Sequence, residues 1–182
     1  MLNINGKDDV SYRYKMIPIT STINGKGNGI YTTILNLNEV CKYINQPPLL
    51  ILKFLSLHFG SMNNDEKISI TGSYTSDELQ KALQIYINRF LICPACTIPE
   101  TIPQINKESK KSIKLELKCS SCGLTSEIKC NNKSEMKIYD LIIKYLEKNE
   151  WSVASKGTMV SQNKEVSSNN ISEEDNEINP FS

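Results

Sequence analysis

Hydrophobic and polar residues follow two kinds of pattern along the first half of the chain, and together these predict a mixed α+β fold. Ile17, Ile19 and Ile23 fall at alternate positions, as in a half-buried strand. The loop NGKGNG follows, and then the β-rich run GIYTTIL, so this segment predicts a hairpin. The run KISITGS, at residues 67–73, predicts a further strand.

Three stretches place apolar residues three or four positions apart, as amphipathic helices do. The first follows Asn36, a residue suited to cap it. The second starts at Pro48 and is apolar on most faces, so we expect it in the core. The third follows a capping box of Thr75 and Glu78, and we expect the α/β domain to extend over residues 12–91. The apolar stripe of this third helix consists of Leu79, Ala82, Leu83, Tyr86, Ile87 and Phe90.

Two C-x-x-C pairs, CPAC and CSSC, are separated by 22 residues and predict a metal site with Cys93, Cys96, Cys119 and Cys122 as its ligands. Each short turn directs two thiolates at one ion, and two such turns complete the tetrahedron of a structural zinc site. Because cysteine fills all four positions, no coordination site remains for a catalytic water. Short apolar alternations between and after the pairs predict the strands of a zinc ribbon over residues 92–130.

The first cysteine pair has an alternative interpretation, and two further cysteines lie outside the predicted metal site. A thioredoxin-like redox pair could explain CPAC alone, but it leaves the second pair unexplained. Cys41 lies in the apolar stripe of the first helix and is predicted to be a buried core residue. Cys130 follows the ribbon and receives no role. Gly123 follows the second pair, where a tight turn commonly needs a positive φ angle.

The remaining segments differ sharply in composition. Residues 1–11 are polar and lack periodicity, which predicts a flexible arm. Residues 131–151 contain an amphipathic helix that we expect to pack on the preceding domains. Residues 152–182 hold too few apolar side chains to offset the entropy of ordering, so we expect disorder. Two lysines against five acidic residues give this tail a charge of −3, which leaves +4 on the preceding residues because the whole chain carries +1. The apolar positions of the last helix are Met136, Tyr139, Ile142, Ile143 and Leu146.

Several classes of function find no support in the sequence. The first ten residues contain no apolar signal segment, and the longest apolar stretch, Leu49–Leu57, falls well short of the roughly 20 residues of a membrane span. We therefore expect a soluble, cytoplasmic protein without a membrane partner. One histidine, His58, and the lack of a Ser/His/Asp set, of paired catalytic carboxylates or of a P-loop predict a protein without its own active site.

Two short motifs leave alternatives open. In YRYKM, Arg13 and Lys15 alternate with Tyr12 and Tyr14. These charges are either a solvated pair entering a strand or an arginine presented to phosphate or RNA. The loop GKGNG lacks the G-K-[ST] ending of a phosphate cradle. It is either a hairpin loop whose glycines supply positive φ angles or a surface where Lys26 and backbone amides meet an anionic partner.

Five elements, in order, resemble the N-terminal part of the eukaryotic translation initiation factor 5 family: YRYKM, GKGNGI, NQPPLLILKFLSLHFG, ITGSY, and CPAC with CSSCG. They cover roughly residues 10–150. The related beta subunit of initiation factor 2 shares the α/β-plus-ribbon plan but lacks the YRYKM start and the GKGNG loop. The resemblance implies a small α/β domain similar to initiation factor 1, followed by a four-cysteine zinc ribbon.

The resemblance also implies a function. Members of this family accelerate GTP hydrolysis by initiation factor 2 in the 40S ribosomal preinitiation complex, close to the initiator tRNA, and so help to select the start codon. The GTP would belong to the gamma subunit of the partner, with the beta subunit as a further contact, and the chain would act as a monomer. Arg13 would be an arginine finger in trans, supported by Lys53 and Lys15. The stretch described as nucleotide-binding in relatives corresponds to Gly25, Lys26, Gly27, Asn28, Gly29, Ile30, Tyr31 and Thr32.

Two features depart from the family pattern. Tyr31 stands where the family uses a second lysine, and Lys26 is a hypothetical substitute for it. The family continues into a C-terminal helical-repeat domain that grips the beta subunit, whereas this chain ends at Ser182 after an Asn/Ser/Glu tail. Two other functions stay open: a non-catalytic ribosome- or RNA-binding module resembling the beta subunit, and a zinc-ribbon adaptor of transcription. The first would bind the complex without accelerating hydrolysis, and the second would bind no initiation component.

Overall fold

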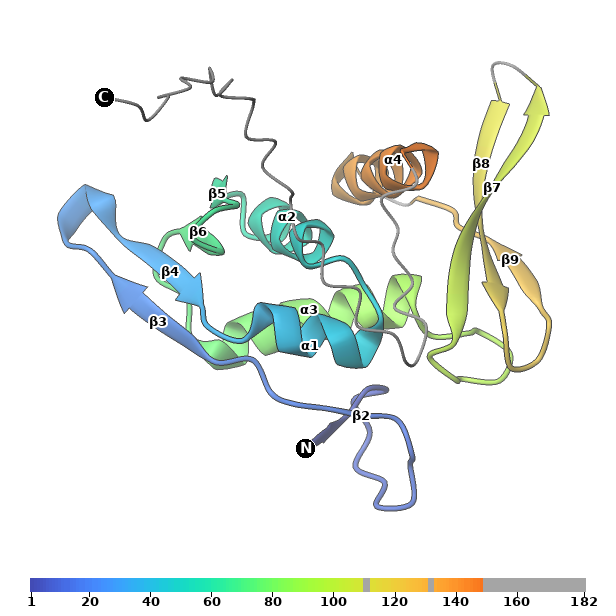
Figure 1. The fold of residues 1–182 in the computed structure, drawn as a ribbon, viewed down its shortest axis with the longest axis horizontal. Coiled ribbons are helices and arrows are strands. Elements are labelled where there is room, and N and C mark those ends of the chain that lie inside the picture. Colours follow the sequence, from blue (N-terminus) through green and yellow to red (C-terminus); the bar gives the residue numbers. More distant parts are fainter. Residues whose placement is uncertain (110–111, 131–132, 149–182) are drawn as a thin grey trace, which may run out of the picture.

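Helices occupy the middle of the molecule, between two groups of strands (Figure 1). A computed structural model describes residues 1–109, 112–130 and 133–148. A four-stranded sheet lies at one end of the long axis and a three-stranded ribbon at the other. This arrangement confirms the predicted α+β class. The tail predicted to be disordered, 152–182, lies outside the described residues.

The four-stranded sheet is antiparallel throughout, in the order β3–β4–β6–β5. β3 (Ser21–Asn24) and β4 (Tyr31–Ile34) form the predicted hairpin. β4 also pairs with β6 (Ser69–Thr71), which in turn pairs with the short β5 (Asn63–Asn64). The sequence pattern predicted that Ile19 and Ile23 would both lie on the buried face of a strand. Ile19 is buried, but Ile23 in β3 is 50% exposed.

Three helices follow the hairpin in sequence. α1 spans Leu37–Ile44, α2 spans Pro48–His58 with its proline at the first position, and α3 spans Ser76–Phe90. α2 packs against β5 and β6, and α1 and α3 pack against α2. The predicted capping box of α3 is present: the Thr75 hydroxyl accepts from the amide of Glu78, and the Glu78 carboxylate accepts from the amide of Thr75 at 2.8 Å. Such a cap satisfies two amides that the helix itself leaves without partners.

Asn36 precedes α1, but its side chain makes no capping hydrogen bond to the helix. Its carboxamide instead accepts from the amide of Thr20 at 2.8 Å and donates to the carbonyl of Pro18 at 2.8 Å. Asn36 thus occupies the predicted N-cap position, but its side chain does not cap the helix. The carboxamide satisfies backbone groups of the segment before β3 instead, a contact that sequence spacing could not reveal.

The first residues differ from the flexible arm that their polar composition predicts. β1 (Leu2–Asn3) pairs with β2 (Lys15–Met16), so the segment folds back on itself as an antiparallel pair. Ile4 is buried, and its carbonyl accepts from the Gln84 side chain of α3 at 2.9 Å. One apolar side chain and one tertiary hydrogen bond thus attach a segment that has no periodicity of its own.

The ribbon is an antiparallel sheet in the order β7–β8–β9, followed by the last described helix. Its strands are β7 (Thr101–Ser109), β8 (Ser112–Cys119) and β9 (Thr125–Glu127), and α4 spans Lys133–Glu147. α4 packs against both α2 and β7, as expected for the final helix. Across the described residues, every helix falls short of the length and apolar character needed to span a membrane.

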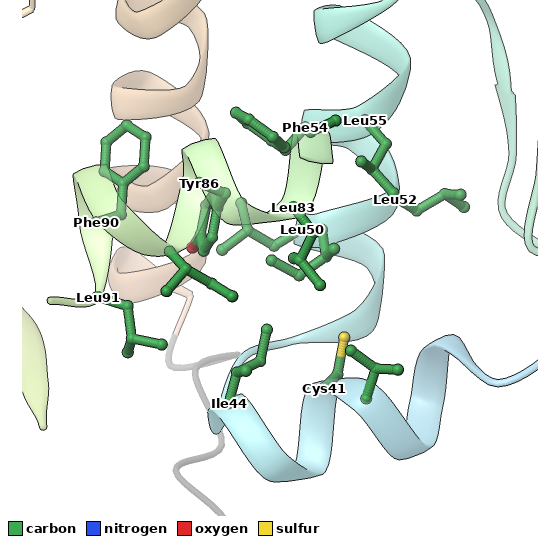
Figure 2. Packing of buried hydrophobic residues seen from close by; sticks show 14 of the residues in the cluster. Cys41, Ile44, Leu50, Leu52, Phe54, Leu55, Leu83, Tyr86, Phe90 and Leu91 are labelled. Carbon is green, nitrogen blue, oxygen red and sulfur yellow. The ribbon is translucent and has the colours of Figure 1, made fainter. Parts of the chain in front are cut away.

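One hydrophobic cluster joins the α/β part, the ribbon and α4. Figure 2 shows its centre, where Cys41 and Ile44 of α1 meet Leu50 and Phe54 of α2 and Tyr86 of α3. The rings of Phe54 and Tyr86 lie 5.1 Å apart, edge to face. Cys41 is buried as predicted, and burial raises the pKa of its thiol to about 12. The cluster's members from the ribbon and α4 are Leu115, Leu117, Ile128, Ile138 and Ile142.

The buried residues of α4 differ in part from the apolar stripe predicted for this helix. Ile138 and Ile142 are its buried residues, whereas Met136, which the stripe included, is 55% exposed. A helix at the edge of a core buries a narrow stripe, and its exact rotation depends on the surface beneath it.

Candidate functional site

Four cysteine sulfurs come together at one end of the ribbon. Cys93 and Cys96 lie between α3 and β7, while Cys119 ends β8 and Cys122 lies in the turn that follows. The Sγ atoms of Cys93 and Cys122 are 3.6 Å apart, as are those of Cys96 and Cys119, and all four lie within 4.8 Å of one another. Bonds of about 2.3 Å in a tetrahedron place sulfurs about 3.8 Å apart, so the cluster fits a metal ion such as zinc.

The two cysteine turns share one backbone design. The amide of Thr97 donates to the carbonyl of Cys93 at 2.9 Å, and the amide of Gly123 donates to the carbonyl of Cys119 at 3.0 Å. Both donors have positive φ angles, 57° at Thr97 and 77° at Gly123. The positive φ angle predicted for Gly123 is therefore confirmed. Thr97 takes the same place in the first turn, although a β-branched residue is strained in this conformation.

Substitutions at Gly123 and Thr97 are expected to change the stability of the protein in opposite directions. Gly123→Ala adds a Cβ that meets no atom within 4 Å, so its cost comes from the positive φ angle alone, about 1–2 kcal/mol. Thr97→Gly relieves the same kind of strain and should stabilise the protein by about 0.5–1 kcal/mol. Denaturant midpoints of the metal-loaded variants measure both changes. Equal destabilisation by both substitutions would contradict this account of the two turns.

Titration of the thiols reflects the crowding of four sulfurs. Burial raises the pKa of Cys93, but the amides of Cys96 and Ala95 and the neighbouring thiols outweigh it and bring the pKa to about 7. The amide of Ile98 lowers the pKa of Cys96, but burial and the other three thiols raise it to about 12. A bound dication removes this competition because it favours thiolate at every ligand. Metal affinity should therefore rise with pH.

The motif YRYKM is joined to the start of the ribbon by one hydrogen bond. Tyr12 and Tyr14 pack against the hydrophobic cluster, and their rings lie 5.7 Å apart. The Tyr14 hydroxyl donates to Oε1 of Glu100, the residue before β7, at 2.6 Å. Burial raises the pKa of Tyr12, and the phenol of Tyr14 and the thiol of Cys96 raise it further. The motif and the ribbon, some eighty positions apart in sequence, form one surface.

Arg13 is exposed between these two anchored tyrosines. Its Cζ lies 5.6 Å from the centroid of the Tyr14 ring, within the range of a cation–π contact. The sequence interpretation placed this arginine next to a flexible arm. The structure differs, because the residues on both sides of Arg13 pack on the body of the protein and β2 begins two positions later. The guanidinium group is thus free to reach a partner while its backbone is held.

The two lysines implied by the resemblance lie in different places. Lys15 begins β2, and its ammonium group donates to the carbonyl of Val10 at 3.4 Å. Lys53 lies on α2, with its Nζ 4.0 Å from a carboxylate oxygen of Asp65. Lys53 also lines a groove of about 480 Å³ between α2 and α4, together with Lys137 and Lys144.

The glycine loop forms the exposed tip of the β3–β4 hairpin. Gly25 and Gly27 have φ angles of 85° and 59°, as predicted for a tight loop. A Cβ at Gly25 would lie 2.2 Å from the carbonyl oxygen of Gly29, so only glycine fits there. Tyr31 is already in β4, paired with Thr71. Figure 1 places this tip at the opposite end of the long axis from the ribbon, whereas Tyr14, next to Arg13, bonds to Glu100 at the start of the ribbon. The loop and Arg13 therefore do not form one site.

Sequence reasoning missed three residues that join these parts. Glu100 binds Tyr14, as described above. Arg89, in the last turn of α3, donates to the carbonyl of Lys129 and forms an ion pair with Glu135 at 3.4 Å. The Tyr139 hydroxyl of α4 accepts from the amide of Leu115 in β8 at 2.7 Å. Each contact joins segments far apart in the chain, and none has a signal in local spacing.

Comparisons with known proteins agree with this architecture. Residues 5–125 match the family described as the domain found in initiation factors 2B and 5, a stretch that covers both the α/β part and the four cysteines. The chain is 38% identical over 138 residues to eukaryotic translation initiation factor 5 of Dictyostelium discoideum. It is 34% identical over 140 residues to the probable eukaryotic translation initiation factor 5 of Schizosaccharomyces pombe, and 34% over 137 residues to that factor of Caenorhabditis elegans.

These alignments cover 72–73% of this chain but 30–35% of each relative. The chain therefore spans about a third of the length of the curated relatives it matches. The family match itself includes YRYKM, the glycine loop, the first three helices and both cysteine turns. On these grounds, the chain belongs to the family defined by the domain found in initiation factors 2B and 5.

Proposed function

We propose that this chain is a translation initiation factor that stimulates GTP hydrolysis by initiation factor 2 during start-codon selection. The GTP is bound by the gamma subunit of that partner, and Arg13 acts on it in trans. The observation that carries the proposal is an exposed arginine between two anchored tyrosines, in a chain whose relatives are named initiation factor 5.

A guanidinium group suits this role for physical reasons. It stays charged at all relevant pH values, and its planar fork can donate two hydrogen bonds to phosphate oxygens. In phosphoryl transfer, such a finger stabilises charge that develops on the transferring group. An arginine whose backbone and ring contact are already fixed loses less conformational entropy when it docks. The anchored tyrosines on either side of Arg13 support the proposal in this way.

The other candidate residues take supporting roles in this proposal. Lys53 is half-exposed and weakly paired with Asp65 across 4.0 Å, so a phosphate-bearing partner can compete for its ammonium group. Lys15 holds the backbone of Val10 and shapes the segment that carries Arg13. The glycine tip, with Lys26, contacts the preinitiation complex rather than cradling GTP. Zinc occupies the four-cysteine cluster as a structural ion.

A reconstituted assay tests the proposal directly. Preinitiation complexes are assembled from initiation factor 2 loaded with GTP, initiator tRNA and 40S subunits, and phosphate release is followed with and without this chain. The chain is expected to accelerate release at sub-stoichiometric concentration, because it is regenerated after each turnover. Binding to the complex without any acceleration would overturn the proposal.

A second candidate function is that of a non-catalytic RNA-binding module. The groove between α2 and α4 favours it, because Lys53, Lys137 and Lys144 face the same space there, with Asp140 as an acidic lining residue. Lysines that neutralise phosphates make RNA affinity fall steeply with salt. A steep salt dependence together with unchanged GTP hydrolysis would favour this second function over the first.

A further inference from the structure

The hydrogen bond between Tyr14 and Glu100 joins residues that are 86 positions apart. The donor–acceptor distance is 2.6 Å, as expected for a hydroxyl donating to a carboxylate. The pair is partly buried, so water competes for these groups less than at an open surface. Through this bond, a side chain of the arginine motif is tied directly to the start of the metal ribbon.

Glu100 is held firmly by its own surroundings. Its carbonyl accepts from the amide of Ser120 at 2.9 Å, and Ser120 lies inside the second cysteine turn. The next residue, Thr101, is buried, and its hydroxyl donates to the carbonyl of Leu91 at 2.8 Å, just beyond the end of α3. The Glu100 carboxylate thus projects from a segment that is fixed to the second cysteine turn and to the helical core.

Arg13 is connected to this fixed carboxylate through one ring. The guanidinium carbon lies 5.6 Å from the Tyr14 centroid, while the hydroxyl of the same ring donates to Glu100. The position of Tyr14 therefore decides where the backbone of Arg13 sits and which way its side chain leaves the surface. Loss of the hydroxyl would remove the tie to Glu100 but leave the ring available to the guanidinium group.

We propose that Tyr14 and Glu100 are positioning residues, which orient Arg13 from the metal ribbon for its action on the partner's GTP. This inference rests on the proposed function. In this proposal the ribbon fixes Glu100, Glu100 holds Tyr14, and Tyr14 orients Arg13, while the metal ligands make no contact with the nucleotide. A finger that is misplaced by a small distance loses much of its effect, because transition-state contacts depend on accurate geometry.

Tyr14→Phe is the sharpest test, because it deletes one oxygen atom and keeps the ring. The maximal stimulated rate of GTP hydrolysis should fall about tenfold, with the half-saturating concentration of the chain nearly unchanged. Glu100→Ala should lower the rate to a similar extent, and Glu100→Gln should retain most of it because its amide oxygen still accepts from the phenol. The double variant Tyr14→Phe/Glu100→Ala should be no slower than either single variant. Tyr43→Phe, on the exposed face of α1, is the matched control.

Cleavage after Arg13 by an arginine-specific protease gives a readout that needs no GTPase. The fragment 1–13, measured by mass spectrometry, should appear about tenfold faster from Tyr14→Phe than from the wild-type chain, because cleavage requires the segment to leave the surface. Glu100→Gln should stay close to wild type. Far-UV circular dichroism and the zinc content of each variant show whether it is folded. If Tyr14→Phe fails to fold, the difference between Glu100→Ala and Glu100→Gln tests the proposal instead.

The outcomes separate the two proposals. An unstimulated wild-type complex would overturn the proposed function, while the cleavage rates would still decide whether Tyr14 and Glu100 hold Arg13. Unchanged cleavage and an unchanged maximal rate in Tyr14→Phe would overturn the positioning roles. A higher half-saturating concentration with an unchanged maximal rate would also overturn them, because it would assign the pair to binding alone.

Discussion

Replacing Arg13 by alanine is expected to slow stimulated GTP hydrolysis by about 10³–10⁵-fold, close to the intrinsic rate of the partner. The physical reason is that an arginine finger stabilises charge which appears only in the transition state. Its loss should therefore lower the rate of the chemical step and leave assembly intact. Arg13→Lys should recover little of this, because an ammonium group lacks the planar fork of guanidinium. Single-turnover phosphate release from preassembled complexes measures the effect.

Two controls make this result specific. Lys42→Ala removes a positive charge from an exposed position of α1 and should leave the stimulated rate within about twofold of wild type. Binding of Arg13→Ala to the complex, measured separately, should match wild type. An unchanged hydrolysis rate with Arg13→Ala would exclude the finger assignment even if the wild-type chain stimulates its partner.

Removal of the metal is expected to unfold the ribbon. Structural zinc sites of this kind contribute apparent binding free energies of about 10–16 kcal/mol at pH 7, more than the total stability of most domains of this size. Cys119→Ser should have the same effect, because Cys119 is buried, ends β8 and donates its amide to the carbonyl of Leu124 at 2.8 Å. Metal analysis should find one zinc per wild-type chain, and a strong chelator should change the circular dichroism spectrum.

Loss of the metal should also abolish stimulation of GTP hydrolysis, although the ligands carry out no chemistry. The reason is that Glu100, which binds the Tyr14 hydroxyl, is fixed to the second cysteine turn through the amide of Ser120. Cys130→Ser is the matched control, since Cys130 is partly buried but lies outside the four-cysteine cluster. A chelated protein that keeps both its ribbon and its stimulating activity would contradict this prediction.

Local signals predicted most of the elements, because they act within one turn of chain. The capping box at Thr75, the proline start of α2 and the two C-x-x-C turns each depend on residues a few positions apart. The hydrogen bonds of the Asn36 side chain and the burial of Ile4 could not be predicted in this way, because each depends on a distant segment. A polar side chain at a helix start can bond to the helix or to another segment, and only the tertiary fold decides between them.

The candidate site was predictable in its chemistry but not in its arrangement. Four cysteines at ribbon spacing specify a tetrahedral metal site, and an arginine between tyrosines suggests a phosphate contact. No spacing rule, however, connects Tyr14 with Glu100, because the contact depends on how the ribbon packs on the α/β part. The glycine loop lies at the opposite end of the long axis from the ribbon that binds Tyr14, although only a short stretch of sequence separates the loop from the motif (Figure 1).

The continuous hydrophobic cluster bears on how this protein can be shortened. Leu115 and Leu117 of the ribbon bury their side chains in the same cluster as Ile138 and Ile142 of α4. A truncated chain that ends at residue 130 would bare this apolar surface to water, and such patches promote aggregation. The smallest soluble fragment should therefore include α4 through Glu147, whereas the α/β part or the ribbon expressed alone should precipitate or need a solubilising fusion.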